Sequence, residues 1–329
     1  MDTMRTRLCS FWRGLVLGPV FLLLLACEKE ELPVKPYDRG DAEEMVIPIG
    51  VDYSDQVWFD LGTKSIVATN EKLSWDFAFD CRDSLHYIYL NTSLAMMAAP
   101  TGQTEFDAPI DEASLRFRPD HSSGSLDSLA LGTWWRTEEV FVLDLGFRLN
   151  GNIRGKRKVQ FFLEGDVLRF VIADLDGSNR QEGQLEKQSG YGKVAYSLRD
   201  ASPVQIEPGE DDYDLVFTQY TYAFYNPYTP YLVTGVLNNP RLQGSAEINH
   251  KPFDEVSLED AMAVEMRDSL DLIGYDWKVY DFDQGSYTIF SDKVYIVRDH
   301  EGFYYKLHFL DFYNEQGERG YPSLRIQQL

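Results

Sequence analysis

Two carboxylates lie at similar places along the chain, in Trp75-Asp76 and in Tyr213-Asp214. Paired carboxylates can act as the acid and the nucleophile or base of glycoside hydrolysis. The alternative, which we favour, is that each carboxylate accepts hydrogen bonds from backbone N–H groups at the start of a strand. The two positions fall in separate predicted modules, and the sequence holds no nucleophile elbow, phosphate-binding loop or dinucleotide fingerprint. The chain is therefore predicted not to be an enzyme.

Other polar segments indicate turns and surface loops. The acidic stretch 207–214 could attract a divalent cation through clustered carboxylates, but a solvated acidic loop is the simpler interpretation. Segment 174–179 contains the Asp-Gly pair of a hairpin turn and places Gly177 too early for a calcium loop. Cys81 has no evident base partner, and His300 and His308 lack the spacing of a metal motif. No metal site is predicted.

The densest aromatic segment, residues 220–231, is a candidate binding surface. Its Asn226-Pro227 and Thr229-Pro230 steps predict a loop, so Tyr225, Tyr228 and Tyr231 are predicted to be exposed. Aromatic faces stack on sugar rings or on a planar tetrapyrrole, and the hydroxyl of tyrosine adds a hydrogen bond. The alternative is that these tyrosines cover the edge of a core.

Short runs rich in Tyr, Phe, Val and Ile must position these residues. Several of them alternate apolar and polar residues, the period-two pattern of a half-buried strand. The predicted strands include 56–61, 86–90, 140–145, 214–222 and 303–310. One segment is predicted to be helical, because a capping-box-like start at residues 257–260 precedes Ala261–Met266. The predicted fold class is all-β with one short helix.

Similar motifs recur in the same order in the two halves of the chain, at separations of 135 to 147 residues. The paired segments are 57–61 with 194–198, 75–79 with 213–217, Leu90-Asn91 with Leu237-Asn238, 131–136 with 273–278, and 158–170 with 293–307. They predict two tandem β modules, 49–186 and 187–329, each with its own core. The alternative is that β-hairpins of any origin look alike.

The N-terminal residues are predicted to direct the chain to a membrane surface. Basic residues precede the apolar run 14–26, which is too short for a membrane span, so residues 1–26 are predicted to be a signal peptide. Leu24-Leu25-Ala26-Cys27 resembles the lipobox of bacterial lipoproteins, in which the cysteine carries lipid, so Cys27 is the predicted lipidation site. Residues 27–48 are predicted to be an acidic linker. Their first acidic residues, 28–31, resemble an export signal and predict an outer-membrane, surface-exposed location.

Composition limits the partners and the covalent chemistry. The chain has 31 Lys and Arg against 53 Asp and Glu, a net charge of −22. This acidity argues against a nucleic acid partner and against binding to an anionic membrane surface. Once the signal peptide is removed and Cys27 is lipidated, Cys81 is the remaining thiol, so no internal disulfide is predicted.

These motifs resemble those of the HmuY family of lipoproteins, which capture haem at the surface of Gram-negative anaerobes. The resemblance is carried by residues 57–64, the Trp-Asp-Phe-Ala-Phe segment 75–79, Leu90-Asn91 and the Thr-Gly-Gln-Thr-Glu segment 101–105, and it continues at 286–298 and 306–313. It implies an all-β fold with two sheets and loops projecting from one end. It also implies a non-enzymatic protein that captures haem or a similar planar ligand.

The family's haem ligands have partial counterparts in this chain. Its members hold haem iron between two axial side chains, His in some and Met in others. One family histidine corresponds to the Pro119-Asp120-His121 loop, whereas the other corresponds to Phe282 or Val140, which cannot bind iron. His121 is therefore the candidate ligand, with Met96 or Met97 as a soft partner. An exposed loop histidine and packing methionines are the alternatives. The competing function is a surface module that binds a glycan or a partner protein through Tyr225, Tyr228 and Tyr231.

Overall fold

The computed structural model describes residues 40–329, which belong to one compact unit. The predicted signal peptide, the lipidation site Cys27 and linker residues 27–39 lie outside the described residues. The regular secondary structure of the described chain is mainly β-strand, as predicted, with one short α-helix. Among residues 40–329, no helix reaches the length and apolarity of a membrane span.

The strands are β1 (Glu43–Val46), β2 (Asp55–Asp60), β3 (Ser65–Glu71), β4 (Phe77–Asp80), β5 (Ile88–Leu90), β6 (Met97–Pro100), β7 (Val140–Asp144), β8 (Lys156–Glu164), β9 (Val167–Ala173), β10 (Gln181–Glu186), β11 (Lys193–Ser197), β12 (Ser202–Val204), β13 (Leu215–Tyr225), β14 (Tyr228–Asn238), β15 (Gly244–Ile248), β16 (Lys278–Asp281), β17 (Ser286–Ile289), β18 (Val294–Arg298), β19 (Tyr304–Tyr313) and β20 (Arg319–Gln328). The helix is α1 (Leu258–Ala263). The 3-10 helices are η1 (Lys72–Ser74), η2 (Thr92–Leu94), η3 (Glu112–Ser114), η4 (Leu126–Ser128), η5 (Trp134–Arg136) and η6 (Phe253–Glu255).

Two pairs of sheets enclose the two largest cores. Sheets β12-β11-β4-β5 and β10-β9-β8-β7-β6 contribute the residues of the first core, which includes Phe77, Phe161 and Tyr196. Sheets β3-β2-β13-β14 and β1-β20-β19-β18-β15 contribute most residues of the second, among them Phe59 and Phe309. We call these the first and the second sandwich. Each buries apolar residues between facing sheets, the main favourable term in folding.

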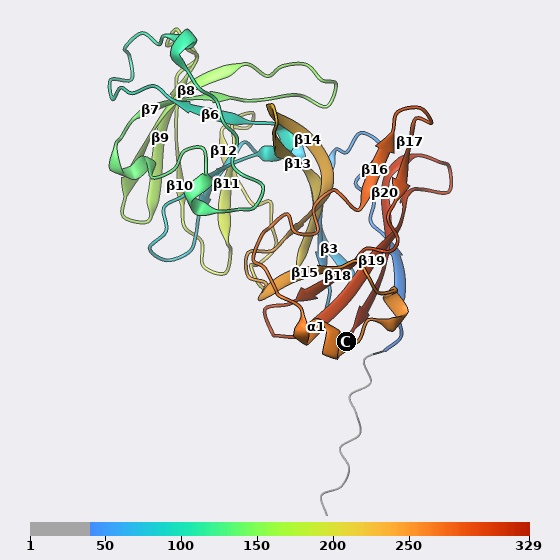
Figure 1. The fold of residues 1–329 in the computed structure, drawn as a ribbon. Coiled ribbons are helices and arrows are strands. Elements are labelled where there is room, and N and C mark those ends of the chain that lie inside the picture. The colour runs from blue at the N-terminus through green and yellow to red at the C-terminus, as the bar shows by residue number, and fades with distance from the viewer. Residues whose placement is uncertain (1–39) are drawn as a thin grey trace, which may run out of the picture. The chain divides into compact units, whose positions relative to one another are not determined.

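The two sandwiches do not follow the predicted boundary between residues 186 and 187. Strands β1, β2 and β3 pair within the second sandwich, and β10, β11 and β12 pair within the first. Figure 1 shows the result, because the blue strand β3 lies among the orange and red strands of the second sandwich. A sequence repeat shows which strands resemble each other. It does not show which sheet each of them joins, because two similar strands can pair with the same neighbouring strand. The predicted modules therefore have to be revised to β4–β12 on one side and β1–β3 with β13–β20 on the other.

The sheet orders nevertheless reveal equivalent strands in the two sandwiches. Reading β10-β9-β8-β7-β6 against β1-β20-β19-β18-β15, and β12-β11-β4-β5 against β3-β2-β13-β14, matches the strands one to one. The register agrees: Phe77 pairs with Tyr196 in the first sandwich, and Leu215 pairs with Phe59 in the second. These are the positions that the similarity of 57–61 to 194–198, and of 75–79 to 213–217, predicts.

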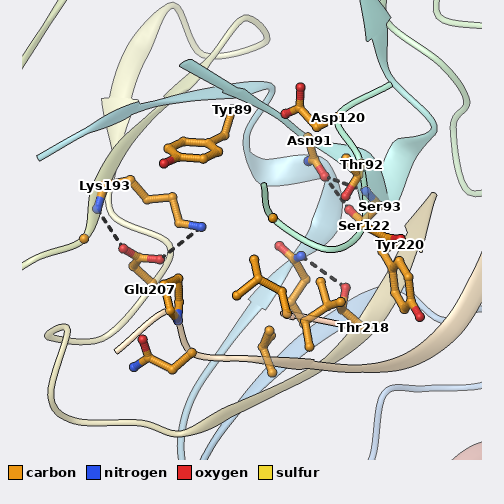
Figure 2. Close-up of a pocket in the computed structure, with 18 of the residues that line it drawn as sticks. Tyr89, Asn91, Thr92, Ser93, Asp120, Ser122, Lys193, Glu207, Thr218 and Tyr220 are labelled. Atoms are coloured by element: carbon orange, nitrogen blue, oxygen red, sulfur yellow. Dashed lines mark hydrogen bonds and ion pairs between the residues drawn. The ribbon is translucent and has the colours of Figure 1, made fainter. Parts of the chain in front are cut away.

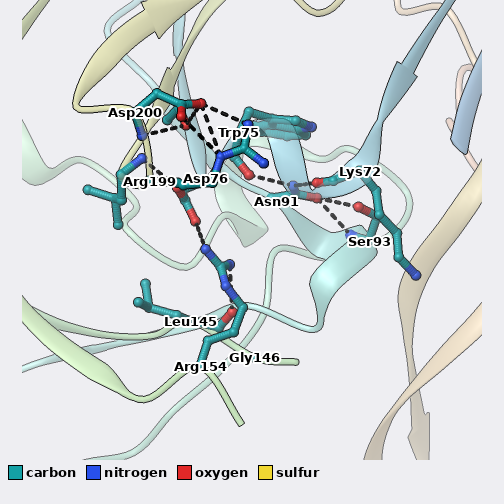
Figure 3. A network of polar contacts seen from close by, with 12 residues as sticks. Lys72, Trp75, Asp76, Asn91, Ser93, Leu145, Gly146, Arg154, Arg199 and Asp200 are labelled. Atoms are coloured by element: carbon teal, nitrogen blue, oxygen red, sulfur yellow. Dashed lines mark hydrogen bonds and ion pairs between the residues drawn. The ribbon is translucent and has the colours of Figure 1, made fainter. Parts of the chain in front are cut away.

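Asp76 and Asp214 occupy equivalent places, and both accept backbone hydrogen bonds as we favoured. Leu198 N–H donates to Asp76 Oδ2 at 2.6 Å, and Leu61 N–H donates to Asp214 Oδ2 at 2.8 Å. Figure 3 shows Asp76 also contacting Arg154. Each carboxylate thus fastens an exchanged strand, β11 or β2, to the sandwich that receives it.

Two of the predicted correspondences are shifted. Asn91 Nδ2 donates to the carbonyls of Lys72 and Trp75, and Asn239 Nδ2 donates to the equivalent carbonyls of Glu210 and Tyr213. The counterpart of Asn91 is therefore Asn239 and not Asn238. Lys158, which we matched with Lys293, corresponds by strand order to Lys306. Both lysines are buried, and each Nζ lies within 5 Å of a phenylalanine ring centroid.

The remaining local predictions are mostly confirmed. Helix α1 begins with the predicted capping box, formed by Ser257 and Asp260, but ends three residues early, before Val264. The predicted loop at 226–231 is instead the tip of a long hairpin, because β14 already starts at Tyr228. Pro230 fits in β14 because this is an edge strand, where a missing N–H is tolerated.

Candidate functional site

A cavity of about 320 Å³ lies between residues of both sandwiches. The first sandwich contributes Tyr89, Lys193 and the loop of Asp120 and His121, and the second contributes Trp58 and Thr218. Figure 2 shows Tyr89, Asp120, Lys193 and Thr218 among the side chains around this space. Its volume is at the lower end of the range of ligand pockets, and its mixture of aromatic, amide, hydroxyl and charged groups suits one small or flat polar molecule.

Hydrogen bonds between the sandwiches hold the walls of the cavity together. Thr221 Oγ1 on β13 donates to the carbonyl of Thr92, at 2.8 Å. Ser122 Oγ donates to Asp271 Oδ2 at 2.5 Å, and the N–H of Leu270 donates to the carbonyl of Ser123 at 3.0 Å. The loop that carries His121 is therefore tied to the second sandwich as well as to its own.

His121 lines the cavity and is partly buried. The backbone N–H of Ser123 donates to His121 Nδ1 at 3.2 Å, so the neutral ring carries its proton on Nε2. Coordination of a metal by Nε2 requires that proton to move to Nδ1, where Ser123 Oγ, 2.8 Å away, can accept a hydrogen bond. The neighbouring Asp120 is buried and accepts from the N–H groups of Leu90 and Ala130. Burial raises the pKa of Asp120 to about 6.

The structure separates the other predicted ligands. Met96 is fully buried in the first core, so its sulfur packs there and does not reach the cavity. Met97 is the first residue of β6 and is half-buried. Neither methionine lines the cavity, so neither completes a pair of axial ligands with His121 in this conformation.

The three predicted tyrosines are exposed, as expected. Tyr225, Tyr228 and Tyr231 expose 60%, 50% and 63% of their surface at the β13–β14 hairpin. The ring of Tyr225 lies 6.4 Å from that of His121, centroid to centroid, at an interplanar angle of 27°. Two residues that we predicted separately thus lie next to each other, at one edge of the cavity.

One wall of the cavity is charged, and the sequence did not reveal it. Glu207, which we placed in a solvated acidic loop, is buried and accepts from the N–H of Lys193 at 2.8 Å. Lys193 Nζ lies 3.5 Å from Glu207 Oε2 and 5.4 Å from the ring centroid of Tyr89. Arg82 donates from Nε and Nη2 to Asp80, and from Nη2 to the hydroxyl of Tyr89 at 2.7 Å. Burial raises the pKa of Glu207.

The equivalent positions of the second sandwich are neutral. Gln56 precedes β2 residue Val57 as Lys193 precedes Val194, and its Nε2 donates to Thr218 Oγ1 at 3.1 Å. Asn70 Nδ2 and Trp75 Nε1 both donate to Gln56 Oε1, at 3.0 and 2.8 Å. In the sequence repeat, Gln56 corresponds to Lys193. This difference is the sequence signal that could have revealed the charged wall.

The described residues hold no group of three or more His, Cys, Asp and Glu side chains that could bind a metal ion. Cys81 is buried, and burial raises the pKa of its thiol, which keeps it protonated. The arrangement at the cavity is therefore one of hydrogen-bond donors, acceptors and aromatic faces, suited to binding a ligand.

Comparison with known proteins places residues 52–325 under a family model described as HmuY protein. This match runs across both predicted modules. The search of the curated proteins found no match.

Three solved structures are among those similar to this chain. A Bacteroides vulgatus protein proposed to be HmuY-like and haem-binding is 14% identical, with a TM-score of 0.25, over 88% of this chain and 94% of its own. The Tannerella forsythia apo HmuY analogue is 12% identical, with a TM-score of 0.26, over 88% and 98%. Apo PinO from Porphyromonas gingivitis is 9% identical, with the same TM-score and coverage. At these TM-scores the likenesses carry no argument, and the assignment relies on the family model.

Proposed function

The chain belongs to the HmuY family, and from this premise we propose that it is a lipid-anchored outer-membrane protein, exposed at the cell surface, that captures haem or a similar planar ligand without catalysing a reaction. The observation that carries the proposal is the cavity between the sandwiches, with His121 on its wall and Tyr225 beside it. Aromatic and polar groups that converge on one cavity are typical of ligand sites. Cys27, in its lipobox-like motif, would anchor the chain.

His121 would supply one imidazole to haem iron, because it lines the cavity. Met97 does not line the cavity, so it would be a partner only if strand β6 moved. Tyr225 would pack against the ligand beside His121, since their rings already lie together. A flat aromatic surface next to a histidine provides dispersion contact for a macrocycle independently of the iron.

A haemin titration followed by absorption spectroscopy tests the proposal. We expect a Soret band to shift and sharpen on mixing with the protein, and His121→Ala to abolish that change. His250→Ala is the matched control, because His250 is exposed and lies outside the cavity. A haemin spectrum that the protein leaves unchanged would refute haem capture.

A second candidate function is recognition of a surface glycan or a partner protein by the exposed tyrosines, and their exposure at one hairpin favours it. Here Tyr225→Ala and Tyr228→Ala would each reduce the signal on a glycan array or in a pull-down, with no haemin response. Phe282→Ala is the control, since Phe282 is 89% exposed on the other hairpin, β16–β17. Equal signals from all variants would exclude this role.

A further inference from the structure

The charged wall of the cavity is not required by the fold. At two equivalent positions of the wall the second sandwich has Gln56 and Thr218, both neutral, whereas the first has Lys193 and Asp80. Placing charges in a partly buried wall costs desolvation free energy. Neutral amides form the equivalent contacts without that cost, so the charges have to be explained by something that the cavity holds.

Two cations on this wall have unused hydrogen-bond donors. Lys193 Nζ lies 3.5 Å from Glu207 Oε2, longer than a normal N–H···O bond. Arg82 uses Nε and Nη2 for Asp80 and Tyr89, which leaves Nη1 without an acceptor among residues 40–329. Their side chains are 27% and 35% exposed, and both meet at Tyr89 on the cavity wall. An ammonium and a guanidinium with spare donors form a site for a carboxylate.

We propose that Lys193 and Arg82 bind a carboxylate group of the captured ligand, and that Glu207 takes up a proton from solvent as this carboxylate binds. The inference rests on the proposed function, for which haem with its two carboxylates is one ligand of this class. Tyr89 positions the two cations, because its hydroxyl accepts from Arg82 and its ring lies beside Lys193.

The proton uptake follows from the surroundings of Glu207. Lys193 is the cation beside it, Asp80 on β4 is a second carboxylate, and the phenol of Tyr213 packs against it. A ligand carboxylate would compete for Lys193 and add negative charge next to a buried carboxylate, which favours the protonated form of Glu207. Binding is therefore expected to weaken as pH rises.

The experiment compares haemin with haemin dimethyl ester, which lacks free carboxylates, on the wild-type protein and on Lys193→Gln and Arg82→Gln. We expect the wild-type protein to bind the ester at least about tenfold more weakly than haemin, and each variant to bind haemin at least about tenfold more weakly than the wild-type protein does. A factor of this size corresponds to the loss of one charge-assisted hydrogen bond. Lys156→Gln is the control for the change of charge, because Lys156 forms a surface ion pair with Glu112. The Soret position should stay unchanged in the variants, since the iron ligand is untouched.

The Glu207→Gln variant tests whether Glu207 takes up the proton when the ligand binds. Calorimetry in two buffers of different ionisation enthalpy should show proton uptake by the wild-type protein, and Glu207→Gln should remove it and bind haemin more tightly. Equal affinities for haemin and its ester, or unaltered binding by Lys193→Gln and Arg82→Gln, would refute this inference while leaving haem capture intact. Failure of the wild-type protein to bind haemin would refute the proposed function, and this inference with it.

Discussion

The equivalent carboxylates Asp76 and Asp214 differ in one neighbour, and this difference predicts opposite effects of one substitution. Asp76 forms an ion pair with Arg154, whose side chain is 9% exposed. Asp214 accepts from the N–H of Leu61, but its charged neighbours are the carboxylates of Asp60 and Asp299. We expect Asp214→Asn to stabilise the protein at pH 8 and Asp76→Asn to destabilise it.

The magnitude follows from the pKa of Asp214, which burial raises from 3.8 to about 7. Because the folded state holds this proton more tightly than the unfolded state does, stability decreases as pH rises from 3.8 to about 7 and is constant above. Each pH unit corresponds to about 1.4 kcal/mol, so the wild-type protein loses about 3 kcal/mol through this group between pH 5 and pH 8. Asparagine mimics the protonated carboxyl and has no proton to lose.

Asp76→Asn leaves the Arg154 guanidinium buried without its counter-charge, which costs about 3–5 kcal/mol.

Urea unfolding followed by tryptophan fluorescence at both pH values measures these free energies. The difference between wild type and Asp214→Asn should grow by about 3 kcal/mol from pH 5 to pH 8, since all other groups titrate alike in the two proteins. A difference that does not change with pH, or equal destabilisation by the two substitutions at pH 8, would refute the assignment of an unpaired buried carboxyl.

Two further predictions concern the second core and the exchanged strands. Burial lowers the pKa of Lys278 to about 7, and its Nζ lies over Trp277 and Phe312. Lys278→Met should therefore stabilise the protein at pH 7 by about 1–4 kcal/mol, measured by urea unfolding. This gain in stability should disappear by about pH 10, because the lysine of the unfolded chain then also loses its proton. The fragment 72–206 contains all strands of the first sandwich and should unfold cooperatively in urea when followed by circular dichroism, whereas 187–329 lacks β1–β3 and should not. Cooperative folding of 187–329 alone would contradict the observed strand exchange.

The strands were predictable because alternation of apolar and polar residues is a local signal. Residues 56–61 and 140–145 match β2 and β7 to within one residue. The capping box at Ser257 is equally local. The choice of partner is not local, because β2 and β11 carry similar residues and each fits next to either β4 or β13. The loop predicted at Thr229-Pro230 failed for a related reason, since only the sheet order shows that β14 is an edge.

The candidate site was only partly predictable. His121 was identified from the resemblance to the HmuY family and Tyr225 from residue type and loop position, but their proximity depends on the packing of the two sandwiches. Glu207 was assigned to solvent because acidic stretches usually are solvated, yet it is 3% exposed. Burial of a charge depends on a partner distant in sequence, here Lys193, which no pattern within the acidic stretch reveals.

The repeat separates what the fold needs from what the cavity needs. Framework positions are alike in the two sandwiches. Asp76 and Asp214 accept hydrogen bonds from backbone N–H groups next to the exchanged strands, and Asn91 and Asn239 donate to equivalent backbone carbonyls. The positions that line the cavity differ between the two sandwiches. Counting from the equivalent bridges at Arg118 and Arg267, His121 corresponds to Leu270, and Lys193 corresponds to Gln56.

If the two sandwiches had the same residues at equivalent positions, the cavity between them would be close to symmetric. A symmetric cavity would hold a ligand in two equivalent orientations. Here the equivalent positions 193 and 56 hold a lysine in the first sandwich and a glutamine in the second, and both side chains line the cavity. Such a difference in charge favours one orientation of a ligand that carries an anionic group at one end and an apolar face at the other. If the cavity binds a ligand of this kind, as we propose, the difference between positions 193 and 56 predicts one bound orientation.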